Sequence, residues 1–359
     1  MSIVALAACN NTSSSSEKID LLFVVDNSES MAENQGALVA AMPGFVERLE
    51  RSFGGLPSLH IGVISSDVGV DVGTGTAIQT CTVSGDDGLL QSTPRIGGCH
   101  APTDSYISDE VGSDGDRVRN YTGDLANEIA CILPLGIDGC QIEQPLEAVR
   151  RALDGHRPEN AGFLRQDARL AIVFITDEDD CSISDPAILQ NLSPVTSFFC
   201  FEHGVRCEPD DPSSTGEKTG CVPRSSPTIR DINEYAGFVA GLKADPDDIS
   251  IVEIAGNPDP VVIGETIVGT PNLQPSCRGR LGDAVPAVRL RSFVNIFAGG
   301  AASICGDSLD DALTEVVSQL CNCSVATEDE SFYACDAGPG AGAGLIALSI
   351  VFVRRRRRQ

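Results

Sequence analysis

Residues 21–31 read LLFVVDNSESM, in which five apolar residues run directly into Asp26 and are followed by Ser28 and Ser30 at alternate positions. A continuous apolar run of this kind predicts a parallel strand that is buried on both faces. In extended chain, residues i, i+2 and i+4 point to the same side. We therefore expect the strand to end in one carboxylate and two hydroxyls that face the same way.

A second apolar run has the same ending. Residues 169–180 read RLAIVFITDEDD, and this run reaches Asp177. In doubly wound sheets, ligands bind beyond the carboxyl ends of the strands, where the strand order reverses. If the two strands are neighbours there, Asp26 and Asp177 meet at one ion. Hard oxygen ligands in this number favour Mg²⁺, with Mn²⁺ or Ca²⁺ as alternatives.

The remaining periodicity predicts the rest of the fold. Further strands are expected at 59–68 and 249–256, and amphipathic helices at 33–53, 142–153, 231–243 and 309–320. Pro43 is expected to start or kink the first helix. Strands that alternate with amphipathic helices predict an α/β fold: a doubly wound, mostly parallel, Rossmann-like sheet flanked by helices. One such unit accounts for 19–325, with disulfide-rich loop insertions at about 69–139, 181–228 and 257–283.

The charge balance excludes one class of partner. The 359 residues carry a formal net charge of −26, and the one strong basic run is the C-terminal tip, formed by Arg354, Arg355, Arg356, Arg357 and Arg358. A protein with this much negative charge repels nucleic acid and anionic lipid. We therefore expect no nucleic-acid binding. The runs 108–116 and 177–180 are acidic enough to hold Ca²⁺, but neither matches an EF-hand loop, so both are expected to be solvated loops.

The cysteines indicate an oxidising compartment. Of 14 cysteines, twelve lie between Cys81 and Cys323, no pair of CxxC motifs occurs, and there are only four histidines. Disulfides are therefore favoured over zinc sites, and at least five of the six possible bonds among these twelve are expected to form. Because disulfides persist outside the cytosol, the protein is expected to be exported.

The N-terminus suggests a lipid anchor. Residues 3–9 read IVALAAC, which resembles a bacterial lipobox whose cysteine, Cys9, is lipidated after cleavage of the signal peptide. Residues 1–9 are interpreted as a remnant of the signal peptide and lipobox, and 10–18 as a Ser-rich tether. The alternative is an apolar N-terminus in which Cys9 has no such role.

The C-terminus suggests a second connection to the envelope. In 326–359, Cys335 is followed by a Gly-rich spacer, a short hydrophobic segment and the arginine cluster. This order resembles bacterial C-terminal sorting tails of the myxobacterial type, which are cut near the cysteine. The alternative is a simple C-terminal membrane anchor with a positive stop. Either interpretation places the protein in the cell envelope or on the cell surface of a Gram-negative bacterium.

The two strand endings together resemble a known family. FVVDNSESM followed much later by IVFITDED is similar to a von Willebrand factor type A (VWA) domain, and the resemblance covers most of 19–325 as an order of elements. It implies a metal-ion-dependent adhesion site (MIDAS), with Asp26, Ser28 and Ser30 as the Asp-x-Ser-x-Ser loop. Asp177 is implied as the acid at the tip of the later strand.

One element of the family pattern is absent. A threonine in the loop before the middle helix normally completes the site, but that position falls near Cys140 in GIDGCQIEQPL. Glu143 or Gln141 could substitute for it, or Thr122 could fold in from the insertion. The alternative is a degenerate domain that keeps the loops and binds no ion.

These residues predict a binding module and not an enzyme. A loop that supplies hydroxyls and few direct carboxylates leaves its ion electron-poor, so an open coordination position would attract an acidic side chain of a protein partner. An enzyme is disfavoured because no Gly-x-Ser-x-Gly elbow exists around Ser28 and none of the histidines lies in a catalytic motif. The alternative function is a structural envelope lipoprotein with a degenerate or calcium-stabilised, non-adhesive domain.

Overall fold

The computed structural model describes residues 17–73, 80–191, 196–321, 323–324 and 334–335. Strand β1 (Lys18–Val25) lies inside a seven-stranded sheet. The order of that sheet is β13 (Gly300–Ser303), β8 (Ile249–Ala255), β5 (Arg169–Ile175), β1, β2 (Ser58–Ser65), β3 (Ile107–Val111) and β4 (Arg117–Arg119). The first five of these strands pair in parallel, and β3 and β4 continue the sheet as antiparallel strands.

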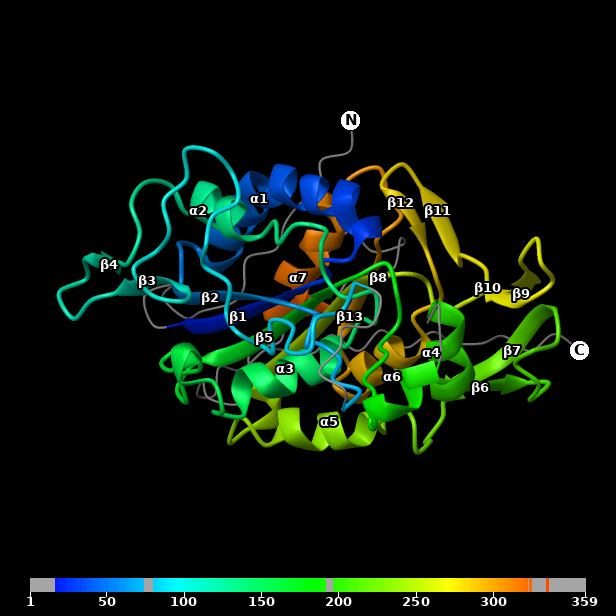
Figure 1. Ribbon diagram of the computed structural model, residues 1–359. Coiled ribbons are helices and arrows are strands. Elements are labelled where there is room, and N and C mark those ends of the chain that lie inside the picture. Colours follow the sequence, from blue (N-terminus) through cyan, green and yellow to red (C-terminus); the bar gives the residue numbers. More distant parts are fainter. Residues whose placement is uncertain (1–16, 74–79, 192–195, 322, 325–333, 336–359) are drawn as a thin grey trace, which may run out of the picture.

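Helices cover both faces of this sheet (Figure 1). One face packs against α1 (Ala32–Phe53), α2 (Leu125–Ile132) and α7 (Asp310–Leu320). The other packs against α3 (Pro145–Leu153), α5 (Ile232–Ala240) and α6 (Val288–Ile296). The predicted α/β class, with a mostly parallel sheet between layers of helices, is confirmed.

The apolar run of β1 is explained by this double coverage. Leu21 and Phe23 belong to the core under α1, whereas Leu22 and Val24 belong to the core under α3. All four side chains are at most 1% exposed. Because successive side chains of a strand point to opposite faces, a strand between two helical layers must be apolar at every position.

Helix α1 does not begin at Pro43, so that part of the expectation is wrong. A single helix runs from Ala32 to Phe53 with Pro43 inside it. Pro43 cannot donate to the carbonyl of Val39. Pro43 is exposed and Val39 is half-buried, so the interruption lies away from the fully buried face of α1.

The segments expected to be loop insertions contain regular structure. Between β2 and α3, the chain forms β3, β4 and α2. After β5 it forms α4 (Ser197–Gly204), β6 (Val205–Glu208) and β7 (Gly216–Pro223), and after β8 it forms β9 (Val261–Glu265) and β10 (Pro271–Leu273). Strands β10, β9, β7 and β6 join in this order as a second sheet, at the right of Figure 1.

The shorter elements complete the described chain. Two small antiparallel pairs are β11 (Cys277–Gly279) with β12 (Gly282–Ala284) and β14 (Cys323–Ser324) with β15 (Ala334–Cys335). Four 3₁₀ helices are η1 (Glu29–Met31), η2 (Pro158–Asn160), η3 (Pro186–Asn191) and η4 (Pro246–Asp248). Helix η1 directly follows the loop that carries Ser28.

Disulfides pin the inserted segments, as the cysteine pattern predicted. The pairs are Cys81–Cys140, Cys99–Cys131, Cys181–Cys200, Cys207–Cys221 and Cys277–Cys305. Cys321 is disulfide-bonded as well, and no cysteine of the described residues is free. The expectation of at least five bonds among the twelve cysteines is therefore confirmed in the structure.

The predicted attachment sites lie largely outside the described residues. Cys9 and Arg354–Arg358 are not described, and Cys335 is described only through the backbone pairing of β15 with β14. Among the described helices, none has the length and apolarity needed to cross a bilayer.

Candidate metal centre

The two strands that end in aspartate are neighbours, as the sequence predicted. Strands β1 and β5 pair in parallel, and Val25 lies opposite Ile175. The backbone amide of Asp26 donates to the carbonyl of Ile175 over 2.9 Å, which extends the pairing by one residue. Asp26 and Asp177 therefore leave the sheet at the same carboxyl edge.

Asp26 is held by the chain around it. One carboxylate oxygen accepts from the backbone amide of Ser28 at 2.8 Å, and the other accepts from the Thr176 hydroxyl at 2.7 Å. Ser28 Oγ lies 3.1 Å from Ser30 Oγ, and Ser30 Oγ donates to Asp177 Oδ1 at 3.2 Å. The structure thus brings Asp26, Ser28, Ser30 and Asp177 together in one hydrogen-bonded group.

This group is buried except at one residue. Asp26, Ser28 and Asp177 are 0%, 3% and 6% exposed, whereas Ser30 is exposed. Ser30 does not continue strand β1. It lies in η1, directly before the start of α1. It therefore marks the side on which solvent or a partner reaches the group.

Of the three residues that could replace the absent threonine, Glu143 interacts with these acids. Gln141 and Thr122 show no interaction with them among the described residues. Glu143 is 1% exposed, and its Oε2 atom has no hydrogen-bond partner among the described residues. Its backbone carbonyl accepts from the amide of Cys181, which ties it to the loop after β5. Gln141 is half-buried, and its backbone amide donates to the Thr80 hydroxyl. Thr122 is exposed.

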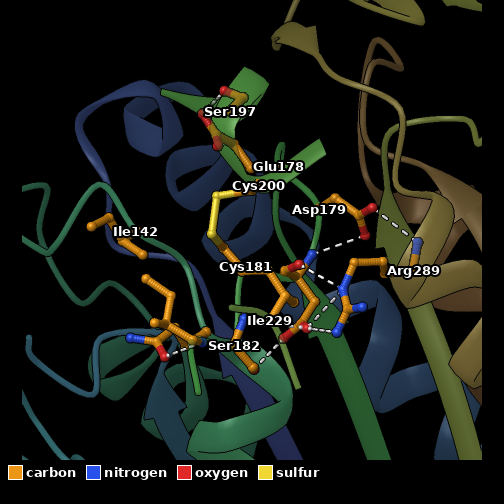
Figure 2. Close-up of a disulfide and its surroundings, with 12 residues drawn as sticks. Ile142, Glu178, Asp179, Cys181, Ser182, Ser197, Cys200, Ile229 and Arg289 are labelled. Carbon is orange, nitrogen blue, oxygen red and sulfur yellow. Dashed lines mark hydrogen bonds and ion pairs between the residues drawn. A yellow bond between two sulfur atoms is a disulfide. The ribbon is translucent and has the colours of Figure 1, made fainter. Parts of the chain in front are cut away.

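Two residues of the site were missed by the sequence analysis. Thr176 holds Asp26, and Glu178 follows Asp177 with its Oε1 accepting from Ser197 at 2.9 Å. Figure 2 shows Glu178 beside Ser197 and Asp179 directed toward Arg289. The expectation that 177–180 is a solvated loop is wrong, because Asp177 and Asp180 are buried. The acidic run after a buried strand was the available signal.

Burial and mutual repulsion raise the pKa of each acid in the group. Desolvation raises the pKa of Asp26. Desolvation, followed by the charges of Asp26 and Glu178, raises the pKa of Asp177 to about 8. Desolvation and the Asp26 charge raise the pKa of Glu178 to about 7. Desolvation and the charges of Glu178, Asp26 and Asp177 raise the pKa of Glu143 well above its usual range.

These four carboxyl groups have no salt-bridge partner within the part of the chain that the structure describes, although other buried acids do. Buried charges are normally paired or bound to metals. Within the same residues, no three Asp, Glu, His or Cys side chains converge closely enough to form a metal site by themselves. A cation would therefore depend on the hydroxyls of Ser28 and Ser30 as well as on the carboxylates.

The residues present fit a divalent cation. Their carboxylate and hydroxyl oxygens are hard donors of the type that Mg²⁺, Mn²⁺ and Ca²⁺ prefer. The Oε2 atom of Glu143 is a buried acceptor that still lacks a partner. Such an ion would be held by Asp26, Ser28, Ser30 and Asp177, with Glu143 as a further metal ligand.

Comparison with known proteins adds little to this geometry. No protein-family model and no curated protein sequence match the chain. Similar solved structures include proximal thread matrix protein 1 from the mussel byssus (12% identity, 85% of this chain and 46% of that chain, TM-score 0.34). They also include the conserved hypothetical protein BatB from Bacteroides thetaiotaomicron (11%, 85% and 97%, 0.32) and an aerotolerance-related membrane protein from Bacteroides fragilis NCTC 9343 (12%, 85% and 98%, 0.33).

The chain thus spans less than half of the mussel protein and nearly all of the two bacterial ones. Scores this low carry no argument about function. The assignment of the site therefore depends on the strand order and on the contacts of Asp26, Ser28, Ser30 and Asp177 in this chain.

Proposed function

We propose that this protein is an exported protein-binding module, in which a divalent cation at the carboxyl edge of β1 and β5 engages an acidic group of a partner. One observation carries the proposal: a buried acid, two hydroxyls and a second acid form one hydrogen-bonded group that is open to solvent at Ser30. Mg²⁺ is the expected ion, with Mn²⁺ or Ca²⁺ as alternatives.

The chain's own residues prepare this site for binding. When bound, the cation would supply a positive centre with an open coordination position. The Ser28 amide and the Thr176 hydroxyl fix the orientation of the Asp26 carboxylate, so it needs little rearrangement to act as a metal ligand. Ser30 is exposed and contacts Asp177, so the partner would approach from its side. No bond is broken, so we propose no enzymatic activity.

The setting of this module is the cell envelope. Five disulfides support export to an oxidising compartment. We propose attachment through lipidated Cys9, through the tail that contains Cys335 and the arginine cluster, or through both. A Gram-negative cell surface is the proposed location.

A second function is favoured by Glu143 and Glu178. Together with Asp26 and Asp177, these residues place more carboxylate around the site than the sequence motif implied. More carboxylate makes a bound ion less attractive to a partner's acid and favours Ca²⁺, which accepts more oxygen ligands than Mg²⁺. The second proposal is therefore a calcium-stabilised structural envelope protein that is not adhesive.

Titration calorimetry on the full oxidised chain tests the ion site. The wild type should bind one Mg²⁺ or Ca²⁺ per chain, and the Asp26→Ala, Asp177→Ala double variant should not. Asp185→Ala is a matched control, because Asp185 is an exposed acid of the same segment whose carboxylate accepts from the nearby Ala187 amide. No cation binding by the wild type would overturn both proposals.

Capture of envelope proteins with the immobilised chain separates the two functions. Adhesion predicts partners that are retained with Mg²⁺, released by a chelator and absent with the double variant. Cation binding that raises the melting temperature, with no cation-dependent partner, would support the structural function and overturn the adhesive one.

A further inference from the structure

The loop that leaves β5 is tied to the second insertion at two points. Ser197, the first residue of α4, donates its hydroxyl to Glu178 Oε1 at 2.9 Å. Cys181 in the same loop is bonded to Cys200 in the same helix, as Figure 2 shows. Cys181 and Cys200 are 0% and 6% exposed, so this bond lies inside the molecule.

The other side of the loop is fixed to α6. The Asp179 carboxylate accepts from the backbone amides of Arg289 and Leu290, both at 2.9 Å, at the start of that helix. Asp180 forms a buried ion pair with the Arg289 guanidinium at 2.9 Å. A carboxylate at a helix N-terminus is stabilised by the unpaired amides and by the helix dipole. With Asp179 held there, Glu178 extends toward α4.

Glu178 is close enough to the candidate ion ligands to interact with them. The Glu178 amide donates to the Thr176 hydroxyl at 3.0 Å, and that hydroxyl donates to Asp26 at 2.7 Å. The amide of Cys181 in the same loop donates to the Glu143 carbonyl at 2.8 Å, and the charge of Glu178 acts on Glu143. Glu143 is almost completely buried and has one carboxylate oxygen without a partner. This orphan acceptor is an independent indication that a cation belongs beside these acids, because an unpaired buried carboxylate oxygen is costly.

We propose that Ser197 is a positioning residue of the cation site and that the Cys181–Cys200 bond keeps its helix in place. The hydroxyl of Ser197 fixes the orientation of the Glu178 carboxylate, which determines how much negative charge faces the ion. The inference rests on the proposed cation site and extends it, since it makes α4 of the second insertion a determinant of ion affinity and selectivity.

The physical basis is the orientation of a carboxylate by its neighbours. Groups that hydrogen-bond to metal ligands or to their close neighbours are commonly worth about 10–100-fold in metal affinity. An additional carboxylate held near the ion favours Ca²⁺ over Mg²⁺, because Ca²⁺ accepts more oxygens in a less regular geometry. Without the Ser197 hydroxyl, the Glu178 carboxylate loses a hydrogen-bond donor and can turn away from the candidate site.

Calorimetric titration of the full oxidised chain with Ca²⁺ and with Mg²⁺ tests this inference. Ser197→Ala should weaken Ca²⁺ binding by about 10-fold or more and weaken Mg²⁺ binding less. Ser197→Thr retains a hydroxyl and should restore most of the Ca²⁺ affinity. Ser213→Ala is the matched control, because Ser213 donates to Asp211 at 2.8 Å in the same insertion and should leave both affinities unchanged.

The disulfide is tested in parallel. Cys181→Ser with Cys200→Ser should weaken Ca²⁺ binding, whereas Cys207→Ser with Cys221→Ser removes another bond of the same insertion and should not. If the first pair does not fold, Ser197→Ala still decides the question. The melting temperature without ions distinguishes a purely structural role, which would lower it, from positioning, which changes the affinity with little change in ion-free stability.

The outcomes separate this inference from the proposed function. A wild type that binds neither cation would overturn both. A wild type that binds Ca²⁺, together with Ser197→Ala and the Cys181, Cys200 variant of equal affinity, would leave the site standing and overturn the role of Ser197.

Discussion

Individual buried acids show how burial couples the stability of this fold to pH. Glu253 on β8 is 0% exposed, and the guanidinium of Arg291 pairs with one of its oxygens while the other has no described partner. Desolvation, with a smaller contribution from Asp179, raises the pKa of Glu253 to about 7 in spite of Arg291. The protonated form is therefore the one that the folded state favours.

The sign of the pH dependence follows from linkage. Between the ordinary pKa of 4.5 and about 7, the native state holds a proton on Glu253 that the unfolded chain has released. Stability from this group is therefore present below about pH 4.5 and is lost as the pH rises through 7. Glu253→Gln removes this loss. Between pH 4.5 and 8, the free energy of unfolding of the variant should therefore rise by roughly 3 kcal/mol relative to that of the wild type.

Urea unfolding with intact disulfides, at pH 4.5 and at pH 8, measures this difference. Glu234→Gln, at an exposed position of α5, is the control and should run parallel to the wild type. A Glu253→Gln variant whose stability falls as steeply as that of the wild type would contradict the assignment.

At this scale the sequence indicated the ligands that follow a regular pattern. Asp26 and Asp177 could be predicted because each follows a continuous apolar run. Ser28 and Ser30 were predicted from their alternate spacing, although the chain has left the strand there and Ser30 reaches Asp177 from η1. The role of Glu178 could not be predicted, because its carboxylate is held by Ser197 of α4, which comes from a later part of the chain. The polarity of a residue indicates whether it favours an exposed position, but not which distant segment contacts it in the fold.

Among the elements, α5 offers a test of helix propensity. Gly237 lies inside this helix, is exposed, and has open space where a Cβ atom would be added. Gly237→Ala should therefore stabilise the protein by about 0.4–1 kcal/mol, because alanine loses less backbone entropy on folding and fits the helical conformation. Chemical denaturation at constant pH gives the value.

Gly279 in β11 provides the contrasting case. A Cβ atom there would lie 1.5 Å from the carbonyl oxygen of Cys305, whose backbone cannot move freely because Cys305 is bonded to Cys277. Gly279→Ala should destabilise the protein by at least about 1–3 kcal/mol. A destabilised Gly237→Ala, or a neutral Gly279→Ala, would contradict the described packing.

Helix α6 was not predicted from the sequence, and its residues explain why. VRLRSFVNI carries two arginines in a short segment, so its apolar face is incomplete in sequence. Arg289 is nevertheless 1% exposed, because its guanidinium pairs with Asp180. By contrast, α7 was expected because its apolar residues keep regular helical spacing and need no ion pair to be buried.

For the whole molecule, the sequence predicted four strands of the central sheet and missed the second sheet. The predicted strands β1, β2, β5 and β8 are buried at nearly every position, whereas β6, β7, β9 and β10 are partly exposed. Their pairing joins segments 205–223 and 261–273, which lie on either side of β8 and α5. No local periodicity encodes such a long-range pairing: in β7, for example, the buried residue is Lys218.

The disulfide pattern of the whole molecule follows the inserted segments. The five bonds join residues 14 to 59 positions apart, and each closes one inserted segment or ties it to an adjacent element. Removing one such bond from a folded domain costs about 2–5 kcal/mol. Because each bond joins residues of one segment or of adjacent elements, these five pairs are expected in the exported protein.

Alkylation of the exported protein without reductant, followed by digestion and mass spectrometry, should leave these ten cysteines unlabelled and recover the five pairs. A reduced sample, in which all ten become labelled, is the control. Recovery of Cys181 with Cys207, or of any pair that joins the first insertion to the second, would contradict the fold of the insertions. It would also separate α4 from the loop of Glu178, because the Cys181–Cys200 bond is the covalent link between them.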